Sequence, residues 1–303
     1  HLSIRRQRQM CIRDRAYLNE LSTAIDRKHG DYNQFWHDRN YVQFADRVKA
    51  TVVFTHGSQD WNVKPINVYQ MFRALPKSLE KHLFFHNGAH VYMNAWQSID
   101  FRESMNALIC QKLLDLDNGY TLPTVIWQNN QSEQTWEVLD NFGHDNGKHI
   151  QLGKAEASIA NHYEEEIFAK YGKAYQSFKD DLFMDKANAI TLDFELDQDI
   201  QINGRVHLEL RVKSSTNRGL ISAQVLEMGD KKYLAPIPEL KRMNVDNGRL
   251  FKEEALRELP FKQAKYRVIT KGHLNLQNRK DLLSIENVTP NEWMTCLLYT
   301  SPS

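Results

Sequence analysis

An aspartate and a histidine, each placed just after a short apolar run, are the residues of this sequence best suited to catalysis. The first run begins at Val52 and opens, through VVFTHGSQD, into a loop with Asp60. The second, HLFFHNGAH, spans His82 to His86 before it opens into a loop with His90. In serine hydrolases an acid orients such a histidine while the imidazole takes the proton of the serine. On spacing alone a turn aspartate and a solvated histidine remain an open alternative, because loops of α/β proteins commonly hold polar residues.

The serine that such a pair would activate has no candidate in this sequence. The nucleophile-elbow pattern G-x-S-x-G occurs nowhere in the 303 residues. In α/β-hydrolases the acid and the histidine follow the serine along the chain. The sequence therefore predicts the C-terminal half of a serine hydrolase, with Asp60 and His90 but no nucleophile in this chain.

Three histidines recur every four residues, at His82, His86 and His90. On a helix this spacing would place imidazoles on one face and suggest a metal site. The intervening LFF and NG segments instead predict a strand and a turn, in which a four-residue spacing does not converge side chains. We therefore expect neither a metal site nor a cofactor.

Aromatic residues lie near both loops and are candidates for the walls of a substrate pocket. Packing in the core is the alternative interpretation for each of them. Asn62 is distinct because it lies two residues beyond Asp60, at the rim of the same site. The aromatic candidates are Trp36, Tyr41, Trp61, Tyr92 and Trp96.

The elements around the two loops predict alternating strands and helices. Ala50–Phe54 is too short for a helix and is followed by Gly57, so we expect a strand there and another at Leu83–Phe85. A helix is expected after Pro65, and a second after Asp100. Short connections between these elements imply parallel strands with right-handed crossovers. The apolar stripes of the two helices are Val68, Met71, Phe72 and Leu75, then Phe101, Met105, Leu108, Ile109 and Leu113.

After residue 119 the pattern changes to short alternating runs separated by turn residues, which is typical of a β-sandwich. One amphipathic helix interrupts it, with Tyr163, Ile167 and Phe178 on its apolar stripe. The tryptophans of this half could stack on sugars, although core packing is the expectation. The expected strands are Thr124–Trp127, Thr135–Leu139, Ala189–Glu195, Val206–Val212, Leu220–Leu226 and Tyr266–Ile269.

Composition excludes several classes of partner. The chain has 39 basic and 38 acidic residues, which gives no reason to expect nucleic acid or an anionic membrane as partner. No run approaches the length of a membrane-spanning helix. Three cysteines without a C-x-x-C pair fit a reducing compartment, so we expect a cytoplasmic protein. The first fifteen residues do not resemble a targeting signal. MCIRDR near the start and TCLLYTSPS at the end look like translated adapter sequence, so we expect residues 1–15 and 295–303 to be non-native.

Several long segments resemble X-prolyl dipeptidyl aminopeptidases of lactic-acid and related bacteria. The resemblance extends from Ala16 to Met294 and far exceeds a shared fold. The segments include GSQDWNVKP, HNGAHVYMNAWQSIDFRESMNALICQKLL, NGRVHLELRVKSSTNRGLISAQVLEMGDKKYLAP and PFKQAKYRVITKGHLNLQNRKDLL.

The resemblance implies a cytoplasmic serine peptidase that releases N-terminal dipeptides whose second residue is proline, and that is generally a homodimer. Asp60 matches the acid of the triad and His90 matches its base. Asn62 matches an asparagine that helps bind the first peptide carbonyl of the substrate, and Trp61 is a second expected substrate-binding residue. Trp36 would belong to the end of a helical insertion.

The resemblance also implies a fold class of α/β plus all-β. Residues 16–119 would form the C-terminal part of an α/β-hydrolase domain, and residues 120–294 an incomplete jelly-roll β-sandwich. Without the serine, we expect this fragment to be inactive alone. Two other functions remain open: an esterase or acylase of the same superfamily, or a non-catalytic binding module.

Overall fold

The computed structural model describes most of the chain outside two long stretches, residues 160–188 and 235–258. The chain divides into two compact units, His1–His144 with Ile202–Ser303, and Asp145–Gln201. The amphipathic helix expected around Tyr163–Phe178 lies outside the described residues. The described residues are 14–26, 30–60, 63–90, 93, 96, 98–131, 133–143, 147, 149–150, 157–159, 189–234 and 259–302.

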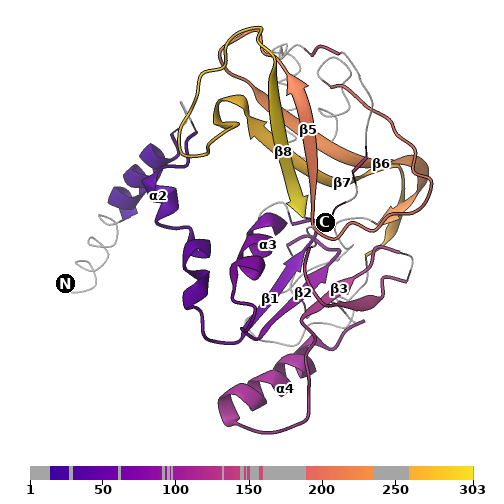
Figure 1. Ribbon diagram of the computed structural model, residues 1–303. Coiled ribbons are helices and arrows are strands. Elements are labelled where there is room, and N and C mark those ends of the chain that lie inside the picture. The colour runs from indigo at the N-terminus through magenta and orange to yellow at the C-terminus, as the bar shows by residue number, and fades with distance from the viewer. Residues whose placement is uncertain are drawn as a thin grey trace, which may run out of the picture. The chain divides into compact units, whose positions relative to one another are not determined.

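A four-stranded sheet holds both loops of interest. Its order is β1-β2-β3-β4, with β1 (Val52–Gly57) parallel to β2 (Lys81–His86). β3 (Val125–Gln128) is parallel to β2 (Figure 1), and β4 (Trp136–Leu139) is antiparallel to β3. The first two predicted strands are therefore confirmed, and their parallel pairing brings their C-terminal ends to one edge of the sheet.

β3 and β4 join this sheet although the sequence placed Thr124–Trp127 and Thr135–Leu139 among the sandwich strands. Every residue of β2 after Lys81 is buried, so this strand needs neighbours on both sides. β1 supplies one neighbour and β3 the other, which leaves β2 in the interior of the sheet. The sheet therefore continues past residue 119, where the composition changes.

Two helices follow β1 and β2, as predicted. α3 (Pro65–Ala74) has proline in its first turn and buries Val68 and Phe72 of the expected stripe. α4 (Phe101–Leu114) begins at Asp100, whose carboxylate accepts a hydrogen bond from the Glu103 amide at 3.1 Å.

The apolar stripe of α4 is buried only in part. Phe101, Met105 and Leu108 contact the core. Leu113, however, is 77% exposed, and Ile109 is exposed as well. The expectation of one continuous buried face is therefore wrong for the C-terminal half of this helix, because the stripe residues that reach the core all lie within 101–108.

Among the described residues after 204, the β-structure forms two antiparallel strand pairs. β5 (Arg205–Val212) pairs with β8 (Met294–Pro302), and β6 (Leu220–Leu234) pairs with β7 (Phe261–Asn275). This agrees with an all-β half, while the jelly roll and the non-native tail from residue 295 stay predictions. Ala189–Glu195 is irregular and almost wholly exposed, so the strand expected there is not formed.

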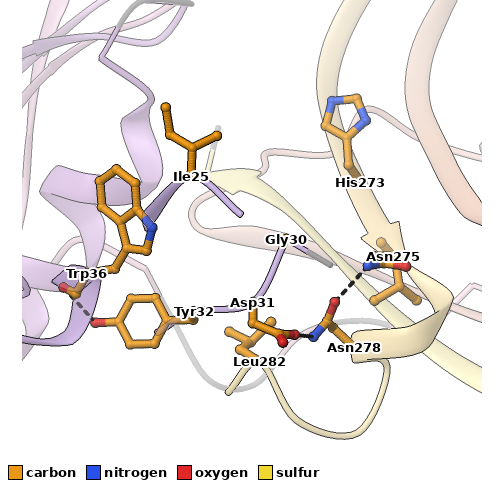
Figure 2. A pocket seen from close by; sticks show the side chains of 10 residues that line it. Ile25, Gly30, Asp31, Tyr32, Trp36, His273, Asn275, Asn278 and Leu282 are labelled. Atoms are coloured by element: carbon orange, nitrogen blue, oxygen red, sulfur yellow. Dashed lines mark hydrogen bonds between the residues drawn. The ribbon is translucent and has the colours of Figure 1, made fainter. Parts of the chain in front are cut away.

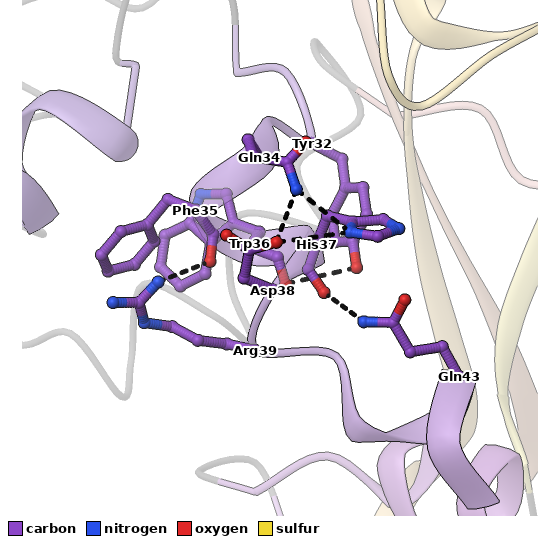
Figure 3. A network of polar contacts seen from close by, with 8 residues as sticks. All are labelled: Tyr32, Gln34, Phe35, Trp36, His37, Asp38, Arg39 and Gln43. Atoms are coloured by element: carbon purple, nitrogen blue, oxygen red, sulfur yellow. Dashed lines mark hydrogen bonds and ion pairs between the residues drawn. The ribbon is translucent and has the colours of Figure 1, made fainter.

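Before the sheet, residues 14–24 are helical, and two shorter elements follow them, α2 (Gln34–His37) and η1 (Tyr41–Arg47). Side-chain to backbone bonds hold them, including Arg39 Nη1 to the Phe35 carbonyl at 2.9 Å and Gln43 Nε2 to the His37 carbonyl at 2.7 Å (Figure 3). The helical character expected between Ala16 and Asp46 is thus found, as a series of short elements.

β2 divides the apolar core into two layers. Phe84 points to the layer that contains Trp96, Leu108 and Ile126. Its neighbours along the strand, Leu83 among them, point to the opposite layer with Phe72. This alternation follows from the two-residue period of a strand and fixes which face of the sheet each helix covers.

The burial of Phe84 predicts a large effect of truncation. Phe84 is 0% exposed, and its ring packs edge-on against that of Phe101 at 5.0 Å. We expect Phe84→Ala to lower the free energy of unfolding by about 3–5 kcal/mol in chemical denaturation, because a cavity remains. The control Leu113→Ala removes a side chain that is 77% exposed and should cost less than about 1 kcal/mol. Equal losses for the two variants would contradict this core assignment.

Candidate active site

Asp60 and His90 meet at the C-terminal edge of the parallel strands. His90 Nδ1 lies 2.8 Å from Asp60 Oδ2. The acid is buried, with 4% of its surface exposed, whereas 62% of the His90 side chain is exposed. The structure thus brings together two side chains 30 residues apart in the sequence.

The carboxylate of Asp60 has a separate partner for each oxygen. Oδ1 accepts a hydrogen bond from the Val63 amide at 2.9 Å, while Oδ2 faces His90. The Asp60 amide in turn donates to the Gly57 carbonyl at 3.2 Å, which closes a turn directly after β1. These bonds fix the carboxylate independently of the imidazole.

Gly57, the last residue of β1, allows the two loops to approach. A Cβ atom at this position would lie 2.3 Å from the Gly88 carbonyl oxygen and 2.4 Å from that of Ala89. Pairing also continues past the strands, since the Ser58 amide donates to the His86 carbonyl at 2.8 Å and the Gln59 amide to the Gly88 carbonyl at 3.1 Å. Only a residue without a side chain fits here, and His90 follows two residues after Gly88.

His56 is a further titratable residue at this edge, and it was not predicted from the sequence. Its ring stacks on Phe85 with a centroid distance of 6.4 Å and an interplanar angle of 12°. Burial is the main cause that lowers the pKa of His56, and the neighbouring His90 lowers it further. The charge of Asp60 and a backbone hydrogen bond with Val63 act in the opposite direction and raise this pKa. The sequence signal that could have indicated a place for His56 at this site is its position one residue before Gly57, in the strand that leads into the loop with Asp60.

The geometry of the pair suits proton transfer. Because Nδ1 of His90 is bonded to Asp60, its other nitrogen, Nε2, is the one available to a substrate or nucleophile. The buried carboxylate both fixes this tautomer and stabilises the imidazolium that forms when Nε2 takes a proton. An acid–base role is therefore what this arrangement can perform.

The other histidines of the predicted series make separate contacts. His82 Nδ1 pairs with the Pro123 carbonyl at 2.9 Å, and His86 Nδ1 accepts from the Gly88 amide at 3.1 Å. Within the described part of the chain, no three histidine, cysteine, aspartate or glutamate residues group in a way that could hold a metal ion.

The remaining candidates divide into three groups. Trp61, Asn62 and Tyr92 lie outside the described residues. Trp96 is 4% exposed and packs on His86, with 5.1 Å between ring centroids, so it belongs to the core beneath the His90 loop.

Trp36 lies in a different hollow, together with Tyr32 and residues of β7 and of the loop after it. This hollow has a volume of about 420 Å³ (Figure 2). Asn278 crosses it to donate to Asp31 at 3.1 Å. Tyr41 is 70% exposed. The interpretation of Trp36 and Tyr41 as walls of a pocket around Asp60 and His90 is therefore not supported by their positions.

Two family models match the chain. The X-Pro dipeptidyl-peptidase (S15 family) model matches residues 3–92. The model of the X-Pro dipeptidyl-peptidase C-terminal non-catalytic domain matches residues 118–302.

Curated relatives are very similar in sequence. A Xaa-Pro dipeptidyl-peptidase of Streptococcus thermophilus is 98% identical over 288 residues, which cover 95% of this chain and 38% of that protein. One of Streptococcus pneumoniae is 57% identical over 290 residues, with the same coverage of 95% and 38%. The chain thus spans about two fifths of the length of these relatives.

Solved structures share the fold at low sequence identity. A CocE/NonD family hydrolase from Staphylococcus aureus matches with a TM-score of 0.59 and 12% identity, over 91% of this chain and 47% of that one. An alpha-amino acid ester hydrolase matches with a TM-score of 0.55 and 14% identity, over 96% of this chain and 52% of that one. At these identities the likeness concerns the fold alone.

The close approach at Gly57 predicts that Gly57→Ala separates the two loops. The added methyl group would meet two carbonyl oxygens of the His90 loop. We expect a loss of about 1–3 kcal/mol in the free energy of unfolding. We also expect loss of the downfield proton resonance of the Asp60–His90 hydrogen bond in NMR spectra. Gly147→Ala is the matched control, since nothing lies within 4 Å of a Cβ there. An unchanged resonance in Gly57→Ala would count against this account of the loop contact.

The lowered pKa of His56 predicts a pH dependence of stability. Its pKa falls below the usual 6.5 mainly through burial, so the folded state favours the neutral ring. This stabilisation is complete above about pH 6.5 and is lost as the pH falls through the lower, folded-state pKa. Denaturation measured from pH 7.5 down to about pH 5 should therefore show a steeper loss of stability for the unmodified chain than for His56→Gln.

The comparison between these two proteins isolates His56. Burial also lowers the pKa values of His207 and His273, but both residues are present in each protein and their effects cancel. His37→Gln, at an exposed position of α2, serves as the control. Parallel stability curves for the unmodified chain and His56→Gln would refute the assignment.

Proposed function

The chain belongs to the X-Pro dipeptidyl-peptidase (S15) family, and we propose from this that the protein it forms part of is a serine exopeptidase that releases N-terminal Xaa-Pro dipeptides from peptides. The observation that carries the proposal is the 2.8 Å hydrogen bond between His90 and the buried Asp60. This bond supports the assignment of His90 and Asp60 as the base and the acid of a serine-hydrolase triad.

In the proposed reaction His90 Nε2 accepts the hydroxyl proton of the serine as the serine oxygen attacks the carbonyl carbon of the proline. The same nitrogen then donates this proton to the departing amine, and the dipeptide remains as an ester on the serine. A water molecule, deprotonated by His90, hydrolyses the ester. Asp60 stays ionised throughout and stabilises the imidazolium.

The serine belongs to a part of the protein outside this sequence, since G-x-S-x-G is missing from the 303 residues. We therefore expect the chain by itself to release no dipeptide from a Gly-Pro chromogenic substrate. This expectation agrees with a chain that spans 38% of its S. thermophilus relative.

Trp61 and Asn62 are the proposed substrate-binding residues of this chain. They are the two residues between Asp60 and Val63. The hydrogen bond from the Val63 amide to the Asp60 carboxylate fixes both ends of this segment. We propose that Asn62 donates its amide to the first peptide carbonyl of the substrate and that Trp61 contributes an aromatic wall.

The remaining elements of the proposal concern the whole protein. We propose a homodimeric enzyme of the cytoplasm, with a jelly roll built from the region of β5 to β8. Among the helices that the structure describes, none has the length and apolar character needed to cross a bilayer.

The test uses the full-length enzyme that contains this segment. His90→Ala should lower kcat for Gly-Pro-p-nitroanilide by about 10²–10⁴-fold, because a positioned general base is lost. Asp60→Asn should also lower kcat, by about 10⁴-fold at most, through loss of the tautomer that it fixes. His37→Ala, at an exposed histidine of α2, is the control and should leave kcat unchanged.

Two outcomes would overturn the proposal. More than about a hundredth of the original rate in His90→Ala would remove His90 as general base. Turnover of simple esters without release of Gly-Pro would instead indicate an esterase of the same superfamily.

A further inference from the structure

A chain of buried amide side chains connects the loop of His90 to the start of β7. It consists of Asn87, Gln128, Asn129 and Gln134, which are exposed by 6%, 1%, 6% and 4%. We name these four residues and their hydrogen bonds the amide relay. Burying an amide without partners costs several kcal/mol, so the partners of each one define how the surrounding segments must lie.

At one end the relay holds Asn87, the first residue after β2. Its backbone amide donates to Gln128 Oε1 at 3.2 Å, and its side-chain Nδ2 donates to the Asn129 carbonyl at 2.5 Å. Both the backbone and the side chain of Asn87 are therefore fixed to the C-terminal end of β3.

In the middle the relay holds the turn between β3 and β4. Gln128 Nε2 donates to the Gln134 carbonyl at 3.2 Å. Gln134 has a φ of +47°, a left-handed backbone that non-glycine residues seldom adopt. The same Gln128 side chain thus touches the His90 loop with its oxygen and this strained turn with its nitrogen.

At the far end the relay reaches the β-structure of the C-terminal half. Gln134 Nε2 donates to the Leu259 carbonyl at 2.8 Å, and the Leu259 amide donates to Gln134 Oε1 at 3.3 Å. This two-point contact resembles a peptide pairing within a sheet. Leu259 is 2% exposed and lies two residues before β7.

The near end of the relay leads directly into the catalytic pair. Gly88, next to Asn87, accepts the Gln59 amide through its carbonyl at 3.1 Å. Gln59 precedes Asp60, and Gly88 precedes His90 by two residues. The His90 loop is thus held between the Asp60 loop on one side and the amide relay on the other.

We propose that Asn87, Gln128 and Gln134 are positioning residues that set the orientation of His90 from the region matched by the C-terminal non-catalytic domain model. This inference rests on the proposed function of His90. Gln128, Gln134 and Leu259 all lie within the 118–302 match, so this region contributes to holding the catalytic base although it supplies no catalytic group of its own.

The first experiment uses this chain alone. NMR of the ¹⁵N-histidine-labelled chain should show the proton shared by His90 Nδ1 and Asp60, and in Gln134→Leu we expect that signal to broaden or vanish through exchange with water. Gln134→Leu removes both bonds to Leu259 at nearly constant volume.

A matched control separates positioning from loss of stability. Val288→Ala truncates a side chain that is 1% exposed, in the separate core cluster of Leu276 and Cys296. It should lower the melting temperature and leave the His90 signal unchanged. Gln131→Met, at an exposed position of the same turn, should change neither.

The second experiment uses the full-length enzyme. Gln134→Leu should lower kcat for Gly-Pro-p-nitroanilide by about ten- to a hundredfold with KM within about twofold, because a small displacement of the base affects the transition state more than binding. Gln128→Leu should act in the same direction.

The outcomes separate this inference from the proposed function. An unchanged His90 NMR signal together with an unchanged kcat in Gln134→Leu would overturn the positioning role of the relay. A loss of the His90 signal in Val288→Ala as large as that in Gln134→Leu would overturn it as well. Should Gln134→Leu not fold, Gln128→Leu decides in its place, because it removes the bonds to the Asn87 amide and to the Gln134 carbonyl without adding a charge. A changed His90 signal in an enzyme that releases no Xaa-Pro dipeptide would refute the function and leave the relay intact.

Discussion

The close contact between the backbone of Gly57 and the loop after β2 is the constraint on which the site depends. Parallel pairing of β1 and β2 brings two loops to one edge of the sheet. A side chain at position 57 would nevertheless keep the two loops from contacting each other. The missing Cβ of Gly57 lets the carbonyls of Gly88 and Ala89 lie directly over the end of β1. His90 therefore reaches a carboxylate that is buried and already fixed by Val63. A larger residue at position 57 would separate acid and base without altering either of them.

The sequence predicted the part of this arrangement that follows from local pattern. β1, β2, α3 and α4 were found where apolar runs and first-turn signals placed them, and the logic of parallel strands indicated that Asp60 and His90 would share an edge. Their hydrogen bond agrees with that expectation. The α/β and β content of the fold likewise followed from the change in pattern near residue 119.

What the sequence did not indicate depends on contacts between distant residues. β3 and β4 alternate like sandwich strands, yet the burial of β2 recruits them into its sheet. Exposure of Leu113 depends on where the covered surface ends, which helical periodicity does not encode. The bond between Gln134 and Leu259 joins residues 125 positions apart, and nothing in the local sequence marks either glutamine of the relay as buried.

The buried amides also explain why a polar chain occupies a place where apolar side chains would fit. A leucine at position 128 or 134 would fill similar space without the desolvation cost of an amide, but it would leave buried backbone groups such as the Asn87 and Leu259 amides without their partners. Apolar packing, however, tolerates small displacements, whereas an unpaired buried amide costs about 1–3 kcal/mol for each lost partner. The relay therefore penalises any shift of Asn87 relative to β3. As the proposed general base, His90 must keep its imidazole aligned to a fraction of an ångström, and such a penalty serves this alignment better than additional apolar area.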